Sequence, residues 1–315
     1  MTENLGTVVV AVGGNSLISD SKHTSLKDQA IAAEESMLHV AEMVAAGWNV
    51  VVTHGNGPQV GFLLRRAELA ARELPSIPLD VLGADTQGAT GYLFVKALHE
   101  EFAKAGVHKE AVAVVTQTVV DPDDPAFASP SKPIGSFMSE EEATGHAQAD
   151  GWNVVEDSGR GWRRVVASPK PKRIVEIDAI RMLNAAGFAV VAGGGGGIPV
   201  VEDGESLRGI EAVIDKDHAT ALLANELNAD VLLISTAVDA VAVNFNTPEQ
   251  RWLSTATVAE LREYLAAGQF GAGSMAPKIE AAIAFIERGG QRVIITSPPR
   301  MVDALAGTAG TTIVP

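Results

Sequence analysis

Short runs of β-branched and small apolar residues alternate along this chain with longer segments of helical periodicity. Thr7 to Val12 and Val231 to Ser235 are two such runs, and neither carries a charge. Uninterrupted apolar strands are typical of parallel sheets that are covered on both faces. Asp28 to Ala46 shows the helical pattern and is followed by Gly47, a residue that commonly closes a helix. The alternation predicts an α/β fold, a three-layer α/β/α sandwich with a mainly parallel sheet.

The same alternation extends over most of the 315 residues. Further strands are expected at residues 49–53, 111–120, 188–192, 212–214, 241–244, 292–296 and 311–314, and further helices at 58–72, 87–105, 174–186, 218–227, 258–266 and 276–288. The segment from Asp121 to Lys172 breaks the pattern with several prolines and glycines, and only Glu140 to His146 has helical character. Long irregular insertions often act as lids or binding loops, so we expect a small protruding subdomain there.

Composition excludes several classes of protein. The formal net charge is −15 and aromatic residues make up 5% of the chain, which argues against nucleic-acid or anionic-membrane partners. There is no cysteine, so disulfides, a thiol nucleophile and cysteine-based zinc sites are excluded. No signal peptide is recognisable, and the longest uncharged stretch, Met182 to Val201, contains six glycines, which do not suit a membrane helix. A soluble, cytoplasmic protein is expected.

Four glycine-rich junctions follow expected strands or open expected helices. They are Gly13-Gly14-Asn15, Gly55-Asn56-Gly57, Gly193 to Gly197, and Gly271 to Lys278. Glycine lets backbone N–H groups approach a ligand, and loops between a strand and a helix N-terminus bind phosphate. One such loop is usually only a tight turn, but four of them predict a site for several phosphate oxygens. Neither the G-x-x-x-x-G-K-[ST] motif nor the dinucleotide fingerprint is present, so the expected site is of neither type.

Three lysines lie among glycine, proline or aspartate residues in this acidic chain: Lys132, Lys216 and Lys278. Each of them alone would be interpreted as a solvated surface lysine. Phosphoryl transfer, however, requires two anions to be held in line and the spreading negative charge to be stabilised. The lysines and the glycine junctions together therefore favour a kinase. Lys278 is the strongest candidate, because a cation in the first turn of a helix opposes the helix dipole unless an anion lies nearby.

Other polar residues leave alternatives open. Asp217 is interpreted either as the N-cap of the helix that follows or as the partner that holds a catalytic lysine. Arg163 and Arg164 form either a cationic clamp or a solvated hairpin. The seven histidines show no H-x-H or H-x-x-x-H spacing, and the G-x-S-x-G elbow is absent, so neither a dedicated metal site nor a serine hydrolase is expected. Mg²⁺ is expected to arrive with ATP or ADP, held mainly by phosphates and water.

Nine short motifs follow one another between Val8 and the C-terminus. They are Ala11 to Asn15, Thr53 to Gly61, Pro78 to Gly83, Asp121 to Phe127, Lys132 to Gly135, Gly161 to Val166, Gly193 to Pro199, Ala212 to Asp217 and Gly273 to Lys278. In this order they resemble carbamate kinase, a family with the amino-acid kinase fold. The resemblance is specific, because the Lys-Pro-Ile-Gly sequence that begins at Lys132 is a feature of carbamate kinases within that fold.

The resemblance implies a homodimeric enzyme that interconverts ATP plus carbamate with ADP plus carbamoyl phosphate. The resemblance also implies that the reaction usually runs toward ATP, in the catabolism of arginine or of other nitrogen compounds. An N-terminal lobe, residues 1–205, would bind carbamate and would include the protruding subdomain at 121–172. A C-terminal lobe, residues 206–315, would bind the nucleotide.

Site residues are carried over motif by motif. Those expected to line the carbamate and the transferred phosphoryl group are Gly13, Gly14, Asn15, Gly55, Asn56 and Gly57. Those expected to contact the nucleotide are Lys216, Thr236, Val238, Ala242, Met275 and Lys278. Lys132 would reach in from the subdomain, and Asp217 would orient the catalytic lysines Lys216 and Lys278. Carbamate is already an anion, so no general base is required.

Three residues depart from the family pattern. Ala237 stands where relatives often carry Asp or Gly, and Ala242 where they often carry an aromatic residue. The absence of a ring at Ala242 would affect the affinity for the nucleotide or the preference for its base. Asp85 stands where a neutral residue is commoner, and it would disfavour a small anion if it pointed inward. Two alternatives therefore stay open: a kinase of the same fold that acts on another small carboxylate, phosphonate or carbamoyl compound, and a catalytically weak sensor of nucleotides or metabolites.

Overall fold

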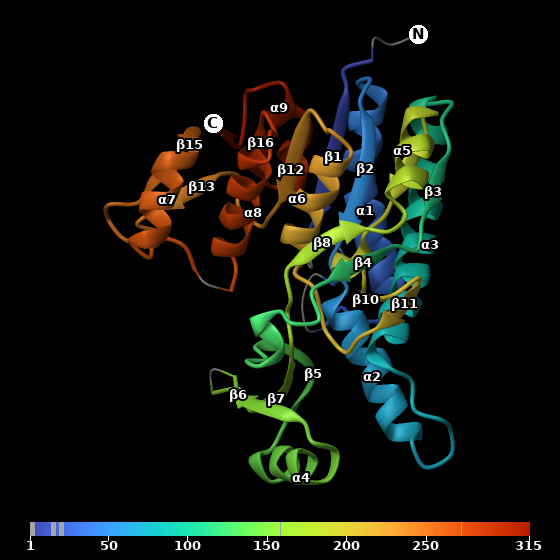
Figure 1. Ribbon diagram of the computed structural model, residues 1–315. Helices are drawn as coiled ribbons and strands as arrows, with labels where there is room; N and C mark the ends of the chain where they lie inside the picture. The colour runs from blue at the N-terminus through green and yellow to red at the C-terminus, as the bar shows by residue number, and fades with distance from the viewer. Residues whose placement is uncertain (1–3, 14–16, 19–21, 158, 272) are drawn as a thin grey trace.

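The computed structural model describes residues 4–13, 17–18, 22–157, 159–271 and 273–315. An eight-stranded sheet runs through the body of the molecule (Figure 1). Its strands, in spatial order, are β15 (Thr255–Thr257), β17 (Thr311–Val314), β16 (Val293–Thr296), β12 (Val231–Ser235), β1 (Thr7–Val12), β2 (Asn49–His54), β9 (Ala189–Val191) and β3 (Ala111–Ala113). Every neighbouring pair is parallel except β16 with β17. The predicted mainly parallel α/β fold is confirmed.

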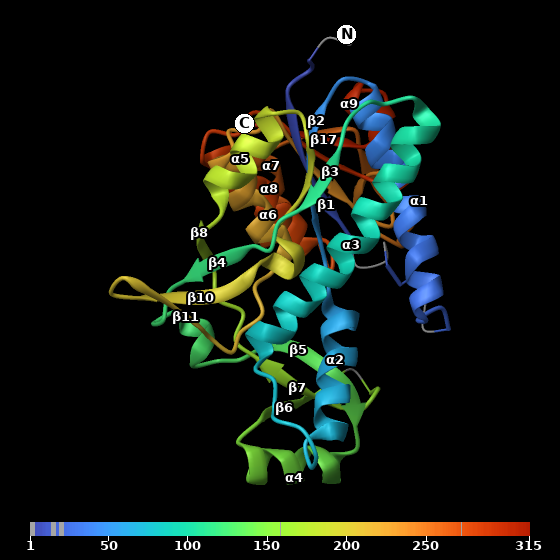
Figure 2. The ribbon, with the colours of Figure 1, turned by 90° about the vertical axis from the view of Figure 1, so that its right-hand side faces the viewer.

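Helices cover both faces of this sheet (Figure 2). The helices α1 (Leu26–Ala45), α3 (Leu79–Ala105) and α9 (Met301–Leu305) lie on one face, and α5 (Ile177–Ala185), α6 (Lys216–Glu226), α7 (Val258–Ala266) and α8 (Ala276–Glu287) lie on the other. Successive side chains of a strand point to opposite faces, so β1 contributes Val8 and Val10 to one apolar cluster and Val9 and Ala11 to the other. Both clusters are buried, which explains why the strands are apolar without interruption.

The segment expected as one strand at residues 111–120 is divided between two sheets, so that prediction was wrong. Its first part is β3 of the large sheet, and its second part is β4 (Gln117–Val120) of a four-stranded sheet. The buried side chain of Gln87 accepts a hydrogen bond from the Thr116 N–H at 2.7 Å and donates one to the Thr116 carbonyl at 3.0 Å. The Thr116 carbonyl also accepts from the Ile198 N–H at 2.9 Å, so both backbone groups of Thr116 are satisfied where the chain leaves the first sheet.

The four-stranded sheet has the order β11-β10-β4-β8. Its other strands are β11 (Ser206–Gly209), β10 (Ile198–Asp203) and β8 (Pro171–Ile174). Ile174 therefore ends a strand instead of opening a helix, and α3 begins at Leu79 instead of Gln87. Residues 212–214 do not form the expected strand, because only an isolated bridge joins Ala212 to Ala167.

The protruding segment folds as an ordered subdomain and is not irregular. It contains the sheet β5-β7-β6, made of β5 (Lys132–Met138), β7 (Trp162–Val166) and β6 (Asn153–Glu156), and the helix α4 (Glu140–Asp150). A capping box between Ser139 and Glu142 starts α4, which is longer than the one or two turns expected. The subdomain lies beyond the carboxyl end of the main sheet, against α2 (Gly57–Ala70) (Figures 1 and 2).

Arg163 and Arg164 belong to the packing of this subdomain. Their guanidinium groups lie over the rings of Phe137 and Trp152, at 5.2 and 4.6 Å from the ring centroids. Neither arginine is a free solvated residue of a hairpin, because Arg163 pairs with Asp157 and Arg164 pairs with Glu211. Neither lines the cleft described below. No helix among the described residues is long and apolar enough to span a membrane.

Candidate active site

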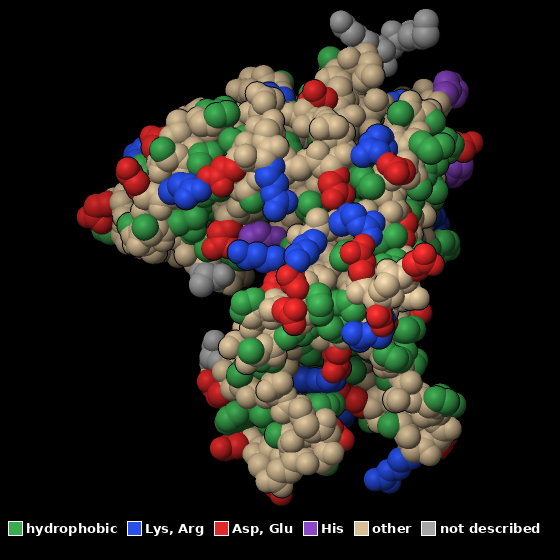
Figure 3. Space-filling model, in the orientation of Figure 1, with side chains coloured by type: hydrophobic (Ala, Val, Ile, Leu, Met, Phe, Trp, Pro, Cys, Tyr) green, Lys and Arg blue, Asp and Glu red, His purple; other side chains and the backbone are tan. Residues whose placement is uncertain are grey.

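A cleft of about 970 Å³ lies where the glycine junctions meet, at the carboxyl ends of β1, β2 and β12. The predicted site residues that line it are Gly13, Gly55, Asn56, Gly57, Lys132, Lys216, Asp217, Thr236, Val238, Ala242, Met275 and Lys278. Gly14 and Asn15 lie outside the described residues. On the face shown in Figure 3, basic and acidic side chains lie next to one another near the junction between the body and the subdomain. The fold therefore brings together residues that are far apart in the sequence, as expected for a parallel sheet.

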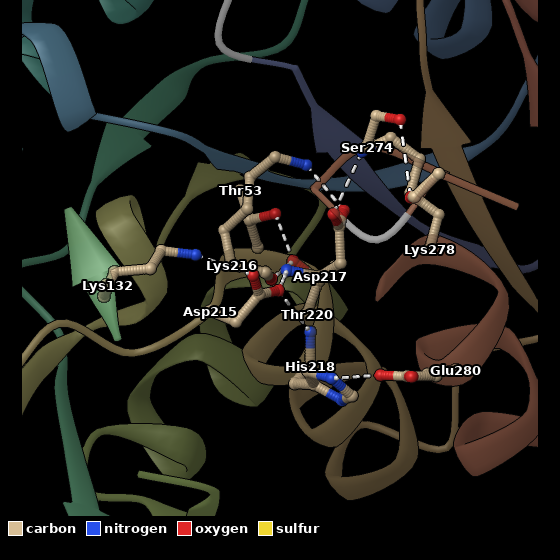
Figure 4. A network of polar contacts seen from close by, with 11 residues as sticks. Thr53, Lys132, Asp215, Lys216, Asp217, His218, Thr220, Ser274, Lys278 and Glu280 are labelled. Atoms are coloured by element: carbon tan, nitrogen blue, oxygen red, sulfur yellow. Dashed lines mark hydrogen bonds and ion pairs between the residues drawn. The ribbon is translucent and has the colours of Figure 1, made fainter. Parts of the chain in front are cut away.

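Asp217 holds two of the predicted lysines. Its Oδ1 accepts a hydrogen bond from Lys216 Nζ at 2.6 Å, and its Oδ2 accepts one from Lys278 Nζ at 3.0 Å. All three side chains are largely buried, with exposed fractions of 14% for Lys216, 13% for Lys278 and 6% for Asp217. Figure 4 shows them converging from α6 and α8. One carboxylate thus fixes two ammonium groups that would otherwise repel each other.

The charges in this cluster depend on one another. Burial lowers the pKa of Lys216, because it penalises the charged ammonium, while Asp217 opposes that effect and Lys278 adds to it. Burial by itself would raise the pKa of Asp217, but the two lysines outweigh it and the pKa of Asp217 is lowered. Asp217 therefore stays ionised at neutral pH, and its charge favours the protonated form of Lys216.

Asp215, and not Asp217, is the N-cap of α6. Its Oδ1 accepts from the backbone N–H groups of Asp217 and His218 at 2.9 and 3.4 Å, because the helix begins at Lys216, two residues before the predicted start. The interpretation of Asp217 as an N-cap was wrong, which leaves its carboxylate available for the lysines. Asp215 was not predicted as a site residue, although it adjoins the predicted site residue Lys216 in the Asp-Lys-Asp sequence.

Asp215 also pairs with Lys132 of the subdomain. Lys132 Nζ donates to Asp215 Oδ2 at 2.9 Å, and Figure 4 shows Lys132 reaching toward the start of α6 from β5. Burial raises the pKa of Asp215, but the Lys132 ammonium more than offsets this and the pKa falls to about 2. Together with the pair between Arg164 and Glu211, this contact ties the subdomain to the segment that precedes α6.

Two glycine junctions fit closely against each other behind the lysines. A Cβ atom at Gly194 would lie 2.4 Å from His54 Nε2, and one at Gly195 would lie 2.3 Å from Asn56 Nδ2, so neither position has room for a side chain. His54 Nδ1 lies 3.0 Å from the Gly55 carbonyl oxygen. Burial lowers the pKa of His54 to about 4, so the imidazole is neutral near pH 7 and its N–H donates to that carbonyl.

The other end of the cleft is apolar and aromatic. Phe245 and Trp252 line it with ring centroids 6.3 Å apart, near Phe270 and Met275. Their rings occupy the same cleft as Ala242, so the aromatic surface that Ala242 does not provide is present nearby. Trp252 belongs to β14 (Arg251–Leu253), which pairs with β13 (Val241–Val243), and Phe245 follows β13 in the chain. Neither aromatic residue was predicted as a site residue, because the sequence does not indicate this pairing.

The other two residues that depart from the family pattern, Ala237 and Asp85, lie in different parts of the structure. Ala237 lies on the cleft wall, beside Thr236 and Val238. Asp85 is exposed on α3 and is not part of the cleft lining. The Asp85 carboxylate therefore does not point into the cleft. Asp85 no longer gives a reason to expect a different acceptor.

Known proteins are similar to this chain over nearly its whole length. Residues 6–297 match the amino acid kinase family. Carbamate kinases from Thermococcus kodakarensis and Pyrococcus furiosus are 47% and 48% identical to the chain, and the matches cover 98% of it and 98% and 99% of those proteins. The carbamate kinase-like protein YahI of Escherichia coli is 50% identical, with 98% of each chain covered.

A solved structure also matches over the whole length. Carbamate kinase from Giardia lamblia, bound to AMP-PNP, has a TM-score of 0.94 and 41% identity, and the match covers 100% of this chain and 99% of that one. The similarity therefore includes the protruding subdomain as well as the main sheet. The chain belongs to the amino acid kinase family and, within it, to the carbamate kinases.

Proposed function

We propose that this protein catalyses the reversible reaction of ATP and carbamate to give ADP and carbamoyl phosphate. The observation that carries the proposal is the buried cluster in which Asp217 holds Lys216 and Lys278 inside the cleft. Two ammonium groups aimed at one place are suited to stabilise the charge that spreads over a phosphoryl group in transit. The similarity to carbamate kinases over nearly the whole chain supports carbamate as the acceptor.

In the proposed reaction a carbamate oxygen attacks the terminal phosphorus of ATP, and the bond from that phosphorus to the ADP oxygen breaks. Lys216 and Lys278 would bind the transferred phosphoryl group, Asp217 would position both, and Lys132 would contact the acceptor from the subdomain. Gly13, Gly55 and Gly57 would offer backbone N–H groups to the acceptor and the phosphoryl oxygens. No side chain has to remove a proton, because carbamate is an anion already.

Mg²⁺ would enter with the nucleotide. Asp215 and Asp217 are the carboxylates at the centre of the cleft, and both are bound to lysines. Coordination would therefore fall mainly to the phosphates and to water, which is the usual arrangement for Mg²⁺ in such enzymes. The apolar end of the cleft, with Phe245 and Trp252, would bind the adenine ring.

The resemblance supports further proposals about organisation. The lobe at residues 1–205, with the subdomain 121–172, would hold the acceptor, and the lobe at 206–315 would hold the nucleotide. We expect a homodimer, for which the exposed apolar side chains of Val81 and Tyr92 on α3 offer a surface that a second copy would cover. Formation of ATP in the cytoplasm, during catabolism of arginine or other nitrogen compounds, fits the reactive mixed anhydride of carbamoyl phosphate.

A coupled assay tests the reaction. Purified protein is mixed with Mg·ADP and carbamoyl phosphate, and ATP is measured through hexokinase and glucose-6-phosphate dehydrogenase. We expect ATP to form at a rate proportional to the protein concentration. Binding of ADP without any ATP formation would contradict the proposal and would leave the alternative of a nucleotide sensor.

A further inference from the structure

The amide of Asn56 is held in one orientation by its hydrogen bonds. Thr86 Oγ1 lies 2.7 Å from the Gly83 carbonyl oxygen, which can only accept, so the hydroxyl proton of Thr86 is donated there. The same Oγ1 lies 2.7 Å from Asn56 Nδ2 and must therefore accept from it. The reverse orientation would set two oxygens against each other without a proton between them. Asn56 Oδ1 is thus the atom left for another partner.

The side chain of Asn56 is also fixed in place by packing. It is 7% exposed, and Gly195 leaves it room only because that residue has no Cβ. Asn56 occupies the N-cap position of α2, where asparagine is among the preferred residues, yet its side chain makes no capping hydrogen bond. The side chain is instead directed to α3, at a cost to the stability of α2. This arrangement indicates a purpose other than helix capping.

Asn56 Oδ1 is an uncharged acceptor in surroundings that mostly donate. Among the residues that the structure describes, nothing donates a hydrogen bond to it, and it is not one of the fully buried polar atoms that lack a partner. Asn56 lines the cleft together with Lys132 and Lys216, which can only donate. The nearby carboxylates of Asp215 and Asp217 accept from those lysines. A ligand N–H group at this end of the cleft would therefore find Asn56 Oδ1 available.

We propose that Asn56 Oδ1 accepts a hydrogen bond from the amino group of the acceptor and thereby selects a carbamoyl group over its methyl isostere. The inference rests on the proposed phosphoryl transfer. Carbamate and acetate have nearly the same shape, but acetate has a methyl group where carbamate has an N–H donor. A methyl group against Asn56 Oδ1 would remove water from the oxygen and give nothing in return. The hydroxyl of Thr86 acts through Asn56 and is a positioning group.

The test compares two phosphoryl donors, carbamoyl phosphate and acetyl phosphate, in ATP formation from Mg·ADP. The quantity measured is the ratio of the two kcat/KM values. In Asn56→Ala we expect this ratio to fall roughly 10- to 100-fold, because the variant has no oxygen that pairs with the amino group or is left unpaired against the methyl group. In Thr86→Val, which frees the amide to rotate, we expect a smaller fall. Thr86→Ser keeps the hydroxyl and serves as the matched control, with the wild-type ratio.

The outcomes separate the inference from the proposed function. Equal losses with both donors in Asn56→Ala and Thr86→Val would leave the ratio unchanged and would overturn the inference alone. Wild-type protein that makes no ATP from either donor would overturn the proposed function and the inference with it. Circular dichroism and binding of AMP-PNP establish that each variant is folded. If Asn56→Ala does not fold, the comparison of Thr86→Val with Thr86→Ser decides the question.

Discussion

The two ends of the cleft are built on different physical principles. At the end that we propose for the acceptor, lysines from α6, α8 and the subdomain are held by Asp215 and Asp217, and glycine junctions exclude side chains. At the end that we propose for the nucleotide, Phe245 and Trp252 offer apolar surface and few polar groups. Charged hydrogen bonds depend strongly on direction and distance, whereas apolar contact depends mainly on the area that is covered. The first end is suited to stabilise a transition state, and the second to hold a substrate.

This difference predicts two classes of variant. An interaction that is made mainly in the transition state lowers kcat when it is lost, while an interaction that is equal in the ground state and the transition state raises KM and leaves kcat unchanged. Substitutions at the acceptor end should therefore affect kcat, and substitutions at the aromatic end should affect the KM for ADP. A variant at one end that showed the kinetic effect expected of the other end would contradict this distinction.

The largest effect is expected for Lys216→Met, which keeps the length of the side chain and removes its charge. We expect kcat to fall roughly 10³-fold, the scale seen when a preorganised group that stabilises transition-state charge is removed. The KM for ADP should change much less. Lys170→Met is the matched control, because Lys170 is exposed and does not line the cleft, and it should retain full activity. A loss of less than tenfold in Lys216→Met would assign the charge stabilisation to other groups.

Asp217→Asn should have the next largest effect. The amide cannot balance two ammonium groups, so kcat should fall on the order of 10²-fold at neutral pH. The sign of the pH dependence also follows. Asp217 raises the pKa of Lys216 against the effect of burial, so its removal lowers that pKa further, and activity should be lost at a lower alkaline pH than in the wild type. Asp85→Asn, on the exposed surface of α3, should leave the pH–rate profile unchanged.

Local sequence patterns predicted much of this architecture but not all of it. The apolar strands were predictable because burial on both faces leaves a local signature, and the glycine junctions and lysines were visible as residues out of keeping with their neighbours. The division of residues 111–120 between two sheets was not predictable, because it depends on Gln87, a residue distant in the sequence. The hairpin of β10 and β11 was also missed, as was the order within the subdomain.

In the candidate site, too, single residues could be predicted from local sequence, but contacts between distant residues could not. Lys132, Lys216 and Lys278 could be selected one at a time, but which carboxylate each of them contacts is a property of the fold. Asp215 was missed because the sequence Asp-Lys-Asp does not show which aspartate contacts which lysine. Phe245 and Trp252 were missed because neither lies beside a glycine junction, and the pairing of β13 with β14 brings them to the cleft.

His54 allows the acceptor end to be tested through stability. The pKa of its imidazole is about 4 in the folded protein against 6.5 for an unperturbed histidine, so the unfolded chain binds more protons between these values. The free energy of unfolding should therefore fall as pH decreases from 6.5 to 4, by about 3 kcal/mol at most at 1.36 kcal/mol per pH unit. Above pH 6.5 this contribution is constant.

Denaturant unfolding at several pH values measures that effect. In His54→Asn, which can still donate to the Gly55 carbonyl, the loss of stability between pH 6.5 and 4 should be smaller than in the wild type by about that amount. An unchanged dependence in His54→Asn would mean that folding does not lower the pKa of His54.

Trp252→Ala should have the smallest effect and should appear only in nucleotide binding. Stacking of a base on an aromatic ring contributes roughly 1–3 kcal/mol, and Trp252 is half exposed and shares the cleft with Phe245, so the low end of that range applies. The KM for ADP should rise about tenfold, which corresponds to about 1.4 kcal/mol, while kcat and the KM for carbamoyl phosphate stay near their wild-type values. Phe62→Ala, an aromatic residue on α2 that does not line the cleft, provides the control. A fall in kcat without a change in the KM for ADP would show that the aromatic end acts on the transition state, and the two ends of the cleft would then not be separable.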